Sequence, residues 1–254
     1  MKPLGAGTAF SLATVPASGG WTAASVGHIA RPCASCSARK VCQAVMIGCC
    51  GKQGGIWEVG TRKVRANEAV YRIGDPLRNL YVPRGGACKS IHLSRDGRQQ
   101  ITGFRLSGEF LGMDAIASGR HETEAVALDG MVVCVLPYRA IEMLADHVYA
   151  VRHGVARLLS AEVVREAGLL MLVGNSSAEE RVAAFLIDLS ERYTARGYSG
   201  ASLTLSMSRE EIGSYLGMKL ETVSRMFARL RQRGLIRLQG KDVHIIDLEG
   251  LRAL

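Results

Sequence analysis

Residues 208–233 read SREEIGSYLGMKLETVSRMFARLRQR, and this stretch decides the fold of the C-terminal end of the chain. Ser208 and Glu211 form a capping box, in which the serine side chain accepts from a first-turn amide and the glutamate reaches back. The helix that they open is expected to end just before Gly217, which supplies a tight turn at positive φ. A basic helix over 220–233 follows. Helix, glycine turn and basic helix are the helix-turn-helix pattern, whose second helix enters the DNA major groove.

The second helix and the segment after it are strongly basic. One acid, Glu221, stands among seven basic residues, which are Lys219, Arg225, Arg229, Arg231, Arg233, Arg237 and Lys241. Residues 235–238 and 243–246 are expected to form a wing hairpin beside the two helices. A helix over 178–194 and a short strand over 202–205 complete the predicted DNA-reading unit, residues 175–254.

Three side chains of the second helix suit the recognition of DNA bases. Glu221, Ser224 and Arg225 fall on one face because of their i, i+3, i+4 spacing. Glutamate accepts from cytosine N4, arginine donates to guanine, and serine tolerates several bases. A simpler interpretation stays open, in which Glu221 only favours a helix N-terminus and Arg225 is a solvated charge.

Lys219 stands where the second helix begins, at the position that usually holds a capping residue. Serine or threonine would accept an amide hydrogen bond there, and lysine cannot. We expect Lys219 to contact a DNA phosphate instead. Arg229 completes the predicted DNA-binding set.

Residues 140–174 have a helical pattern and contain few glycines. Leu159, Val163 and Leu170 fall at heptad a and d intervals, and Glu166 occupies the remaining seam position. A narrow apolar stripe of this kind favours pairing with a second copy of the chain over burial in a core, although an ordinary amphipathic helix is the alternative. Gly174-Asn175-Ser176-Ser177 is expected to end the helix.

The pattern of residues 57–139 predicts a small antiparallel β-roll. Short strands alternate with turn signals such as Gly74-Asp75 and Arg84-Gly85-Gly86. The expected strands are 69–73, 79–82, 88–93, 100–104, 124–128 and 131–136. The predicted fold class is therefore α+β, with a roll, a long helix and a winged helix-turn-helix.

A cysteine-rich loop over 33–56 precedes the roll, and residues 1–32 are expected to be a flexible tail. Cys33, Cys36 and Cys42 follow C-x2-C-x5-C spacing. No export signal is recognisable in the tail, so we expect a cytoplasmic protein, in which clustered cysteines indicate metal or redox chemistry. A structural zinc site stays open from this spacing alone.

Composition and the absence of some motifs restrict the functional class of the protein. The chain has 254 residues, 48% of them apolar, which suffices for two domains, and no run is long enough for a membrane span. A net charge of +9 suits a polyanionic partner such as double-stranded DNA. Neither a dinucleotide-binding glycine pattern nor a recognisable acid–base pair is found, so an iron–sulfur enzyme or electron carrier is the less favoured class and we expect no enzyme.

The motifs together resemble the fumarate–nitrate reduction regulator (FNR) branch of the cyclic-AMP receptor protein superfamily. They are C-x2-C-x5-C, Gln100-Ile101-Thr102-Gly103-Phe104, Gly108-Glu109, Gly112-Met113-Asp114-Ala115-Ile116, Ala178-Glu179-Glu180-Arg181 and Glu221-Thr222-Val223-Ser224-Arg225. The resemblance implies a homodimeric activator or repressor that acts with RNA polymerase and binds a palindrome of the TTGAT-N4-ATCAA type. It further implies a 4Fe-4S cluster that assembles without oxygen, promotes dimerisation and degrades to a 2Fe-2S form in oxygen.

A cubane cluster takes four thiolates, and spacing alone leaves Cys49, Cys50, Cys88 and Cys134 open as the fourth. Cys134 lies in a segment that matches the one carrying the fourth ligand in the family. The resemblance therefore implies Cys33, Cys36, Cys42 and Cys134 as ligands. The alternatives are Zn2+ or a thiol-based redox regulator of the same fold.

Two further expectations follow from the resemblance. The nucleotide-binding members need an arginine and a small hydroxyl residue where alignment places Glu124 and Ala125, so we expect no cyclic AMP. At the predicted dimer seam, two facing Glu166 carboxylates would repel each other. This repulsion is a hypothesis for how the cluster-free protein stays monomeric, and a solvated helix charge is the alternative.

Overall fold

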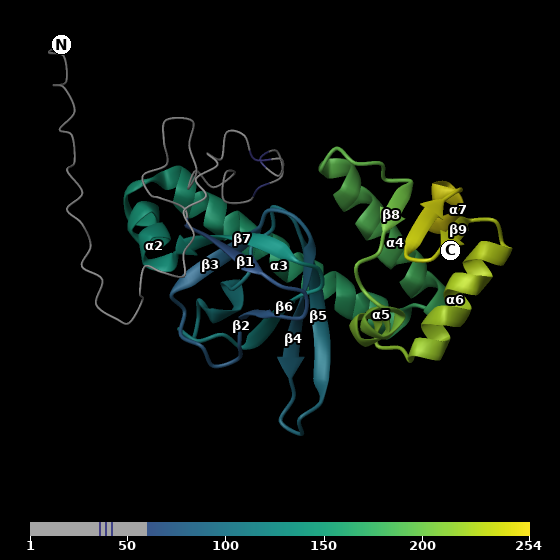
Figure 1. The fold of residues 1–254 in the computed structure, drawn as a ribbon, viewed down its shortest axis with the longest axis horizontal. Coiled ribbons are helices and arrows are strands. Elements are labelled where there is room, and N and C mark those ends of the chain that lie inside the picture. Colours follow the sequence, from purple (N-terminus) through teal and green to yellow (C-terminus); the bar gives the residue numbers. More distant parts are fainter. Residues whose placement is uncertain (1–35, 37–38, 40–41, 43–59) are drawn as a thin grey trace, which may run out of the picture.

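The computed structural model describes Cys36, Arg39, Cys42 and residues 60–254. The expectations for the tail, for Cys33 and for Cys49 and Cys50 lie outside these residues. From the roll onward the chain forms three parts in sequence, a β-roll, a pair of helices and a C-terminal unit of helices with a small sheet (Figure 1).

Two antiparallel sheets build the roll. One has the order β1-β7-β3, with β1 (Gly60–Val64), β7 (Met131–Pro137) and β3 (Asn79–Pro83). The other has the order β2-β6-β4-β5, with β2 (Ala69–Tyr71), β6 (Thr123–Ala127), β4 (Ala87–Leu93) and β5 (Gln99–Leu106). Alternating residues from both sheets fill the interior, among them Val70, Cys88, Ala125 and Val133. The antiparallel roll is confirmed, and β1 is a strand for which no bounds were predicted.

Two helices replace the single helix expected over 140–174. They are α2 (Tyr138–His147) and α3 (Tyr149–Asn175), and the backbone of Val148 between them is extended, at φ −118° and ψ 103°. Ile141 of α2 and Val151 of α3 are both buried in one apolar cluster. In a straight helix, positions ten residues apart lie about 15 Å apart and on different faces. The break at Val148 therefore lets both side chains reach the same core.

The C-terminal unit is a winged helix-turn-helix. Its helices are α4 (Ala178–Ala195), α5 (Arg209–Leu216), α6 (Leu220–Gln232) and α7 (Leu248–Arg252). Its sheet has the order β8-β10-β9, with β8 (Ser202–Thr204), β10 (Asp242–Ile245) and β9 (Ile236–Gln239). Ser177 and Ser208 each cap the following helix in a complete capping box, so both predicted helix starts are confirmed.

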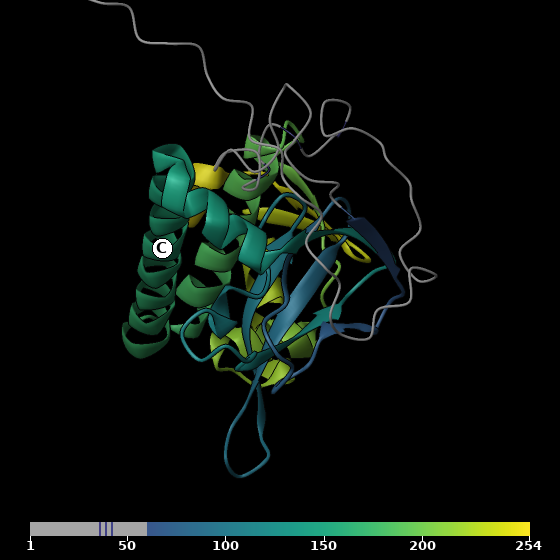
Figure 2. The ribbon, with the colours of Figure 1, turned by 90° about the vertical axis from the view of Figure 1, so that its left-hand side faces the viewer.

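The roll and the C-terminal unit share one apolar core. Ile91, Phe104 and Leu106 of the roll belong to the same buried cluster as Leu186 of α4 and Leu216 of α5. Helix α3 runs along one side of the roll toward this junction, as the two perpendicular views show (Figures 1 and 2). Among the described helices, none is long and apolar enough to cross a membrane.

Candidate DNA-reading face and cysteine site

Two glycines allow the tight turn between α5 and α6. Gly217 has a φ of +65°, which a residue with a Cβ rarely adopts. At Gly213 a Cβ would lie 2.6 Å from the carbonyl oxygen of Met218, which is too close for any side chain. The two helices can therefore approach each other only with these residues, and α6 is held at a fixed angle to α5.

The outer face of α6 presents the three predicted base-reading side chains. Glu221, Ser224 and Arg225 are exposed, while the opposite face of the helix is buried. The buried side chains that support it are Ile212, Leu216, Val223, Phe227 and Leu230, each at most 1% exposed. The Arg225 guanidinium donates to Thr222 Oγ1 at 3.3 Å, which restrains its direction on the helix surface.

The seven basic residues from Lys219 to Lys241 are all exposed. Lys219 is the N-cap of α6 and makes no capping hydrogen bond, so its ammonium remains available to a phosphate. Arg229 differs from Lys219, because its Nε lies 3.1 Å from Glu179 Oε2 of α4. Arg233 shares the same carboxylate at 2.9 Å. Arg229 is thus held against α4, with its side chain 60% exposed.

The outward face of α3 carries the predicted dimer seam. Val163 and Leu170 are 65% and 76% exposed, which is unusual for apolar side chains of this size. Glu166 is exposed between them, and Leu159 is half-buried against the roll. An exposed apolar stripe on a helix is typical of an interface with another chain.

Two of the predicted cluster ligands lie at one end of the roll. Cys134 is on β7, between Thr61 of β1 and Val82 of β3. Cys42 packs against the same apolar cluster as Cys134, and that cluster includes Ile141 and Val151. The Arg39 amide donates to the Cys36 carbonyl at 3.1 Å, and the Cys42 amide donates to the Arg39 carbonyl at 3.4 Å. Thiols from distant parts of the sequence are thereby brought to the start of the two helices.

Thiolates are the usual ligands of an iron–sulfur cluster, and the described residues include three of the four predicted ones, Cys36, Cys42 and Cys134, but the structure does not gather these three into one site. Within the described part of the chain, no three histidine, cysteine or acidic side chains form a group that could hold a metal ion. Cys33, the remaining predicted ligand, lies outside that part. Cys88 is fully buried inside the roll, and burial raises the pKa of its thiol to about 12. Its enclosure among the apolar side chains of the roll makes Cys88 a core residue.

Comparison with known proteins gives the family. The model of the Crp-like helix-turn-helix domain matches residues 180–254, and that of the cyclic nucleotide-binding domain matches residues 61–147. The transcriptional regulatory protein btr of Bordetella pertussis is 42% identical over 192 residues, which are 76% of this chain and 79% of that protein. The fumarate and nitrate reduction regulatory protein of Salmonella typhimurium is 36% identical over 193 residues, 76% of this chain and 77% of that protein. The chain belongs to the CRP/FNR family of transcription regulators.

A solved CRP/FNR-family structure agrees with this assignment. FixK2 from Bradyrhizobium japonicum has 29% identity and a TM-score of 0.72, over 78% of this chain and 98% of that one. The α+β fold and the helix-turn-helix DNA-binding unit are therefore confirmed. So is the expectation that the protein is a regulator and not an enzyme, because the family is one of transcription regulators.

This CRP/FNR-family chain retains a cavity of about 250 Å3 between the roll and α3. Neither Glu124 nor Ala125 lines it, and Glu124 is instead 3.7 Å from Arg72. The charged side chains that do line the cavity are Glu109, Asp114, Glu162, Glu166, Arg105 and Arg165, and both of these arginines pair with Glu162. Glu124 therefore gives no argument against a cyclic nucleotide in this cavity, and the expectation stays a prediction.

Sequence reasoning missed one cluster of charged residues, Glu109 with Arg192 and Arg196. Glu109 was noted only as part of a motif, and neither arginine was singled out. The signal that was available is the spacing of Arg192 and Arg196, which puts both guanidiniums on one face of α4.

Proposed function

We propose that this CRP/FNR-family regulator responds to oxygen through a 4Fe-4S cluster held by Cys33, Cys36, Cys42 and Cys134. When bound, such a cluster supplies an oxygen-labile redox centre. The regulator acts in the cytoplasm as a homodimer that binds a palindrome of the TTGAT-N4-ATCAA type and contacts RNA polymerase as activator or repressor.

The observation that carries this proposal is the shared packing of Cys42 and Cys134. Both thiols contact the apolar cluster that also holds the first turn of α3, through Val151, and the middle of α2, through Ile141. Ligands drawn together there would order the start of α3, the helix whose outer face is exposed and apolar. This route connects the cysteine site to dimerisation through packed side chains alone.

The palindromic DNA site is supported by the outer face of α6. Glu221 and Arg225 are exposed with complementary preferences, since the carboxylate accepts from cytosine and the guanidinium donates to guanine. Two such helices in a dimer with twofold symmetry read two inverted half-sites. We expect no cyclic nucleotide as a second signal, because the two guanidiniums that line the cavity, Arg105 and Arg165, already pair with Glu162.

Glu166 offers a test of the coupling between the cluster and the dimer. The carboxylate is exposed on α3 between Val163 and Leu170, so in a parallel dimer it would face its own copy. We expect Glu166→Ala to increase dimer formation and DNA binding in air. Sedimentation of the air-exposed variant that shows no shift toward dimer would contradict this role and favour a solvated helix charge.

The decisive experiment is purification of the full-length protein without oxygen, followed by its visible spectrum and by iron, sulfide and zinc analysis. A brown protein that bleaches in air and loses DNA binding supports the proposal. A colourless protein with stoichiometric zinc refutes the 4Fe-4S effector and favours a zinc-containing regulator. A protein with neither metal that responds to thiol oxidants favours a thiol-based regulator.

A pair of variants then tests the ligand set. Cys134→Ser is expected to abolish the visible absorption and most of the bound iron, since it removes one of four ligands. Cys88→Ala is the matched control, because Cys88 is enclosed in the roll and its thiol stays protonated. Equal loss of iron in both variants would show that the fold was damaged and not the site.

A further inference from the structure

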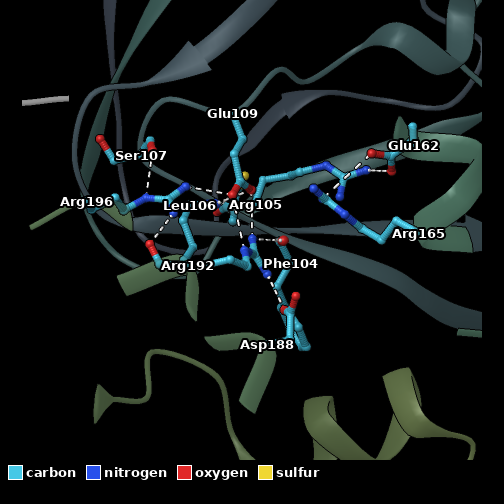
Figure 3. A network of polar contacts seen from close by, with 11 residues as sticks. Phe104, Arg105, Leu106, Ser107, Glu109, Glu162, Arg165, Asp188, Arg192 and Arg196 are labelled. Carbon is cyan, nitrogen blue, oxygen red and sulfur yellow. Dashed lines mark hydrogen bonds and ion pairs between the residues drawn. The ribbon is translucent and has the colours of Figure 1, made fainter. Parts of the chain in front are cut away.

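The C-terminal unit is fixed to the roll by a buried charge cluster. Glu109, only 7% exposed, follows β5 and receives two arginines from α4 (Figure 3). Arg192 Nη2 lies 2.7 Å from Glu109 Oε2, and Arg196 Nη2 lies 2.6 Å from Glu109 Oε1. The Leu106 amide donates to the same carboxylate at 3.0 Å, so its position within the roll is set by the backbone.

The two arginines also bind the backbone of the roll. Arg192 Nη2 donates to the Phe104 carbonyl at 2.8 Å, and Arg196 Nε donates to the Ser107 carbonyl at 2.9 Å. Each guanidinium therefore makes both an ionic and a directional contact with one short segment, residues 104–109. Because arginine donors have a fixed planar geometry, such contacts define an orientation as well as an attraction.

The same segment also contacts the dimer helix. The Arg105 side chain, next to Phe104, bonds to Glu162 of α3, and Arg165 Nη1 lies 3.7 Å from the other oxygen of that carboxylate. Figure 3 shows Arg105 reaching toward α3 while Arg192 and Arg196 reach Glu109 from α4. Residues 104–109, at the end of β5, thus contact both α3 and α4.

A second set of contacts holds the first helix of the helix-turn-helix. Lys89 Nζ of β4 lies 2.6 Å from Glu211 Oε1, and Glu211 is the capping-box residue of α5. Near the other end of α5, the Ile101 amide of β5 donates to Ser214 Oγ at 3.0 Å. The helix that supports α6 is therefore attached to the roll near both of its ends.

We infer that residues 104–109 couple the dimer helix to the DNA-reading unit, with Glu109 as the positioning residue that sets the placement of α6. In a dimer, the placement of α6 on each roll determines the separation of the two recognition helices. That separation selects the spacing between the half-sites of the palindrome. The inference rests on the palindromic binding proposed above and needs no particular signal at the cysteine site.

The test measures spacing preference with the full-length protein, prepared without oxygen. Palindromes with the proposed four-base spacer, with shorter and longer spacers, and a single half-site are titrated by fluorescence anisotropy. In Glu109→Gln, the preference for the best spacer over the others is expected to fall by about tenfold. The affinity for the single half-site and the dimer fraction in sedimentation are expected to stay as in the wild type.

Glu191→Gln is the matched control. Glu191 lies on the same helix as the two arginines, but it pairs with Arg252 within the C-terminal unit and is 61% exposed. It should keep the spacing preference of the wild type. If Glu109→Gln does not fold, Lys89→Met removes the contact with α5 at the edge of the same interface and is expected to weaken the preference in the same direction.

The outcomes distinguish a failure of the coupling from a failure of the proposed palindromic DNA site. A folded Glu109→Gln or Lys89→Met protein with unchanged spacing preference overturns the coupling. Equal loss of affinity for the half-site and for every palindrome also overturns it, because damage to α6 itself is then the cause. If the wild type binds none of the palindromes, the proposed DNA site is wrong, and the preference is measured on sites selected from random DNA by the wild type.

Discussion

The C-terminal unit carries two kinds of arginine, one buried and paired with a carboxylate, the other exposed with few contacts. The side chains of Arg192, on α4, and Arg196, the C-cap of α4, are only 15% and 8% exposed and bind a buried carboxylate. On α6 the side chain of Arg225 is exposed, as is that of Lys219 at the start of the helix. The two groups belong to one chain with a net charge of +9, so net charge alone does not identify the DNA-binding side chains.

The difference lies in what each guanidinium has already bound. Burial disfavours the charged form of Arg192, but Glu109 and Asp188 outweigh it and raise the pKa of its guanidinium. Those partners occupy the donors that a phosphate would need. On α6, Arg225 has one weak contact with Thr222, and its donors can turn to a base. Paired arginines therefore belong to the scaffold, and we expect those with few contacts, such as Arg225, to read the DNA.

The largest expected effect is at the buried carboxylate. Glu109→Ala leaves the buried guanidinium of Arg196 without its counter-charge and that of Arg192 with only Asp188, which costs about 3–5 kcal/mol of the free energy of unfolding. Urea denaturation of the full-length protein measures it. Glu191→Ala removes an exposed pair of the same unit and should cost below about 1 kcal/mol. A similar small loss in both variants would mean that the α4 arginines are no more structural than the surface ones.

Acid should weaken the buried pair selectively. Burial alone would raise the pKa of Glu109, but Arg192 and Arg196 outweigh burial and lower it to about 2 from an ordinary value of 4.5. A lowered carboxyl pKa stabilises the fold above the ordinary value, and this contribution disappears as the pH falls from 4.5 toward 2.

The lost contribution is on the order of 3 kcal/mol. The measurement is urea unfolding of the wild type and Glu109→Gln from pH 6 down to about 3. The stability difference between the two proteins should shrink as the pH falls. A difference that is constant across this range would assign the titration to other carboxylates.

Arg225 should show the opposite behaviour to the α4 arginines. Arg225→Ala removes no buried contact, so the free energy of unfolding should stay nearly unchanged. Discrimination at a single base pair of each half-site should fall by about 1–3 kcal/mol, because a bidentate contact to guanine is lost. Competition binding against a set of single-base variants measures it. A loss that is uniform across these sites would show that Arg225 contacts only the backbone.

Arg229 of α6 shares features with both kinds of arginine. Its guanidinium shares Glu179 with Arg233, although most of its side chain is exposed. This pairing could not be foreseen from the sequence, since Glu179 is separated from Arg229 by 50 residues. The DNA-binding role of Arg229 stays a prediction.

Local patterns predicted the C-terminal unit closely. The capping box at Ser208, the positive φ of Gly217 and the buried face of α6 all depend on residues near one another in the sequence. The predicted bounds of the wing strands each differ by one residue from those of β9 and β10. Local hydrogen-bond rules are sufficient at such sites because each partner lies within one turn.

Long-range contacts could not be predicted in the same way. Arg192 lies 83 residues from Glu109, and no local spacing relates them. The break at Val148 was also missed, because nothing in the sequence opposes a helix there and the cause is the packing of Ile141 and Val151. In both cases the deciding partner is contributed by another part of the fold.

The smallest expected effect is at Lys219. Its side chain makes no capping bond to α6, so Lys219→Ala should leave the free energy of unfolding nearly unchanged. Neutralising one phosphate releases about one counterion, so the slope of log affinity against log salt concentration should become shallower by about 0.9. Affinity should fall equally on specific and random DNA, because phosphate contacts carry no base information. A loss confined to one sequence would mean that Lys219, like Arg225, contacts a base and not only a phosphate.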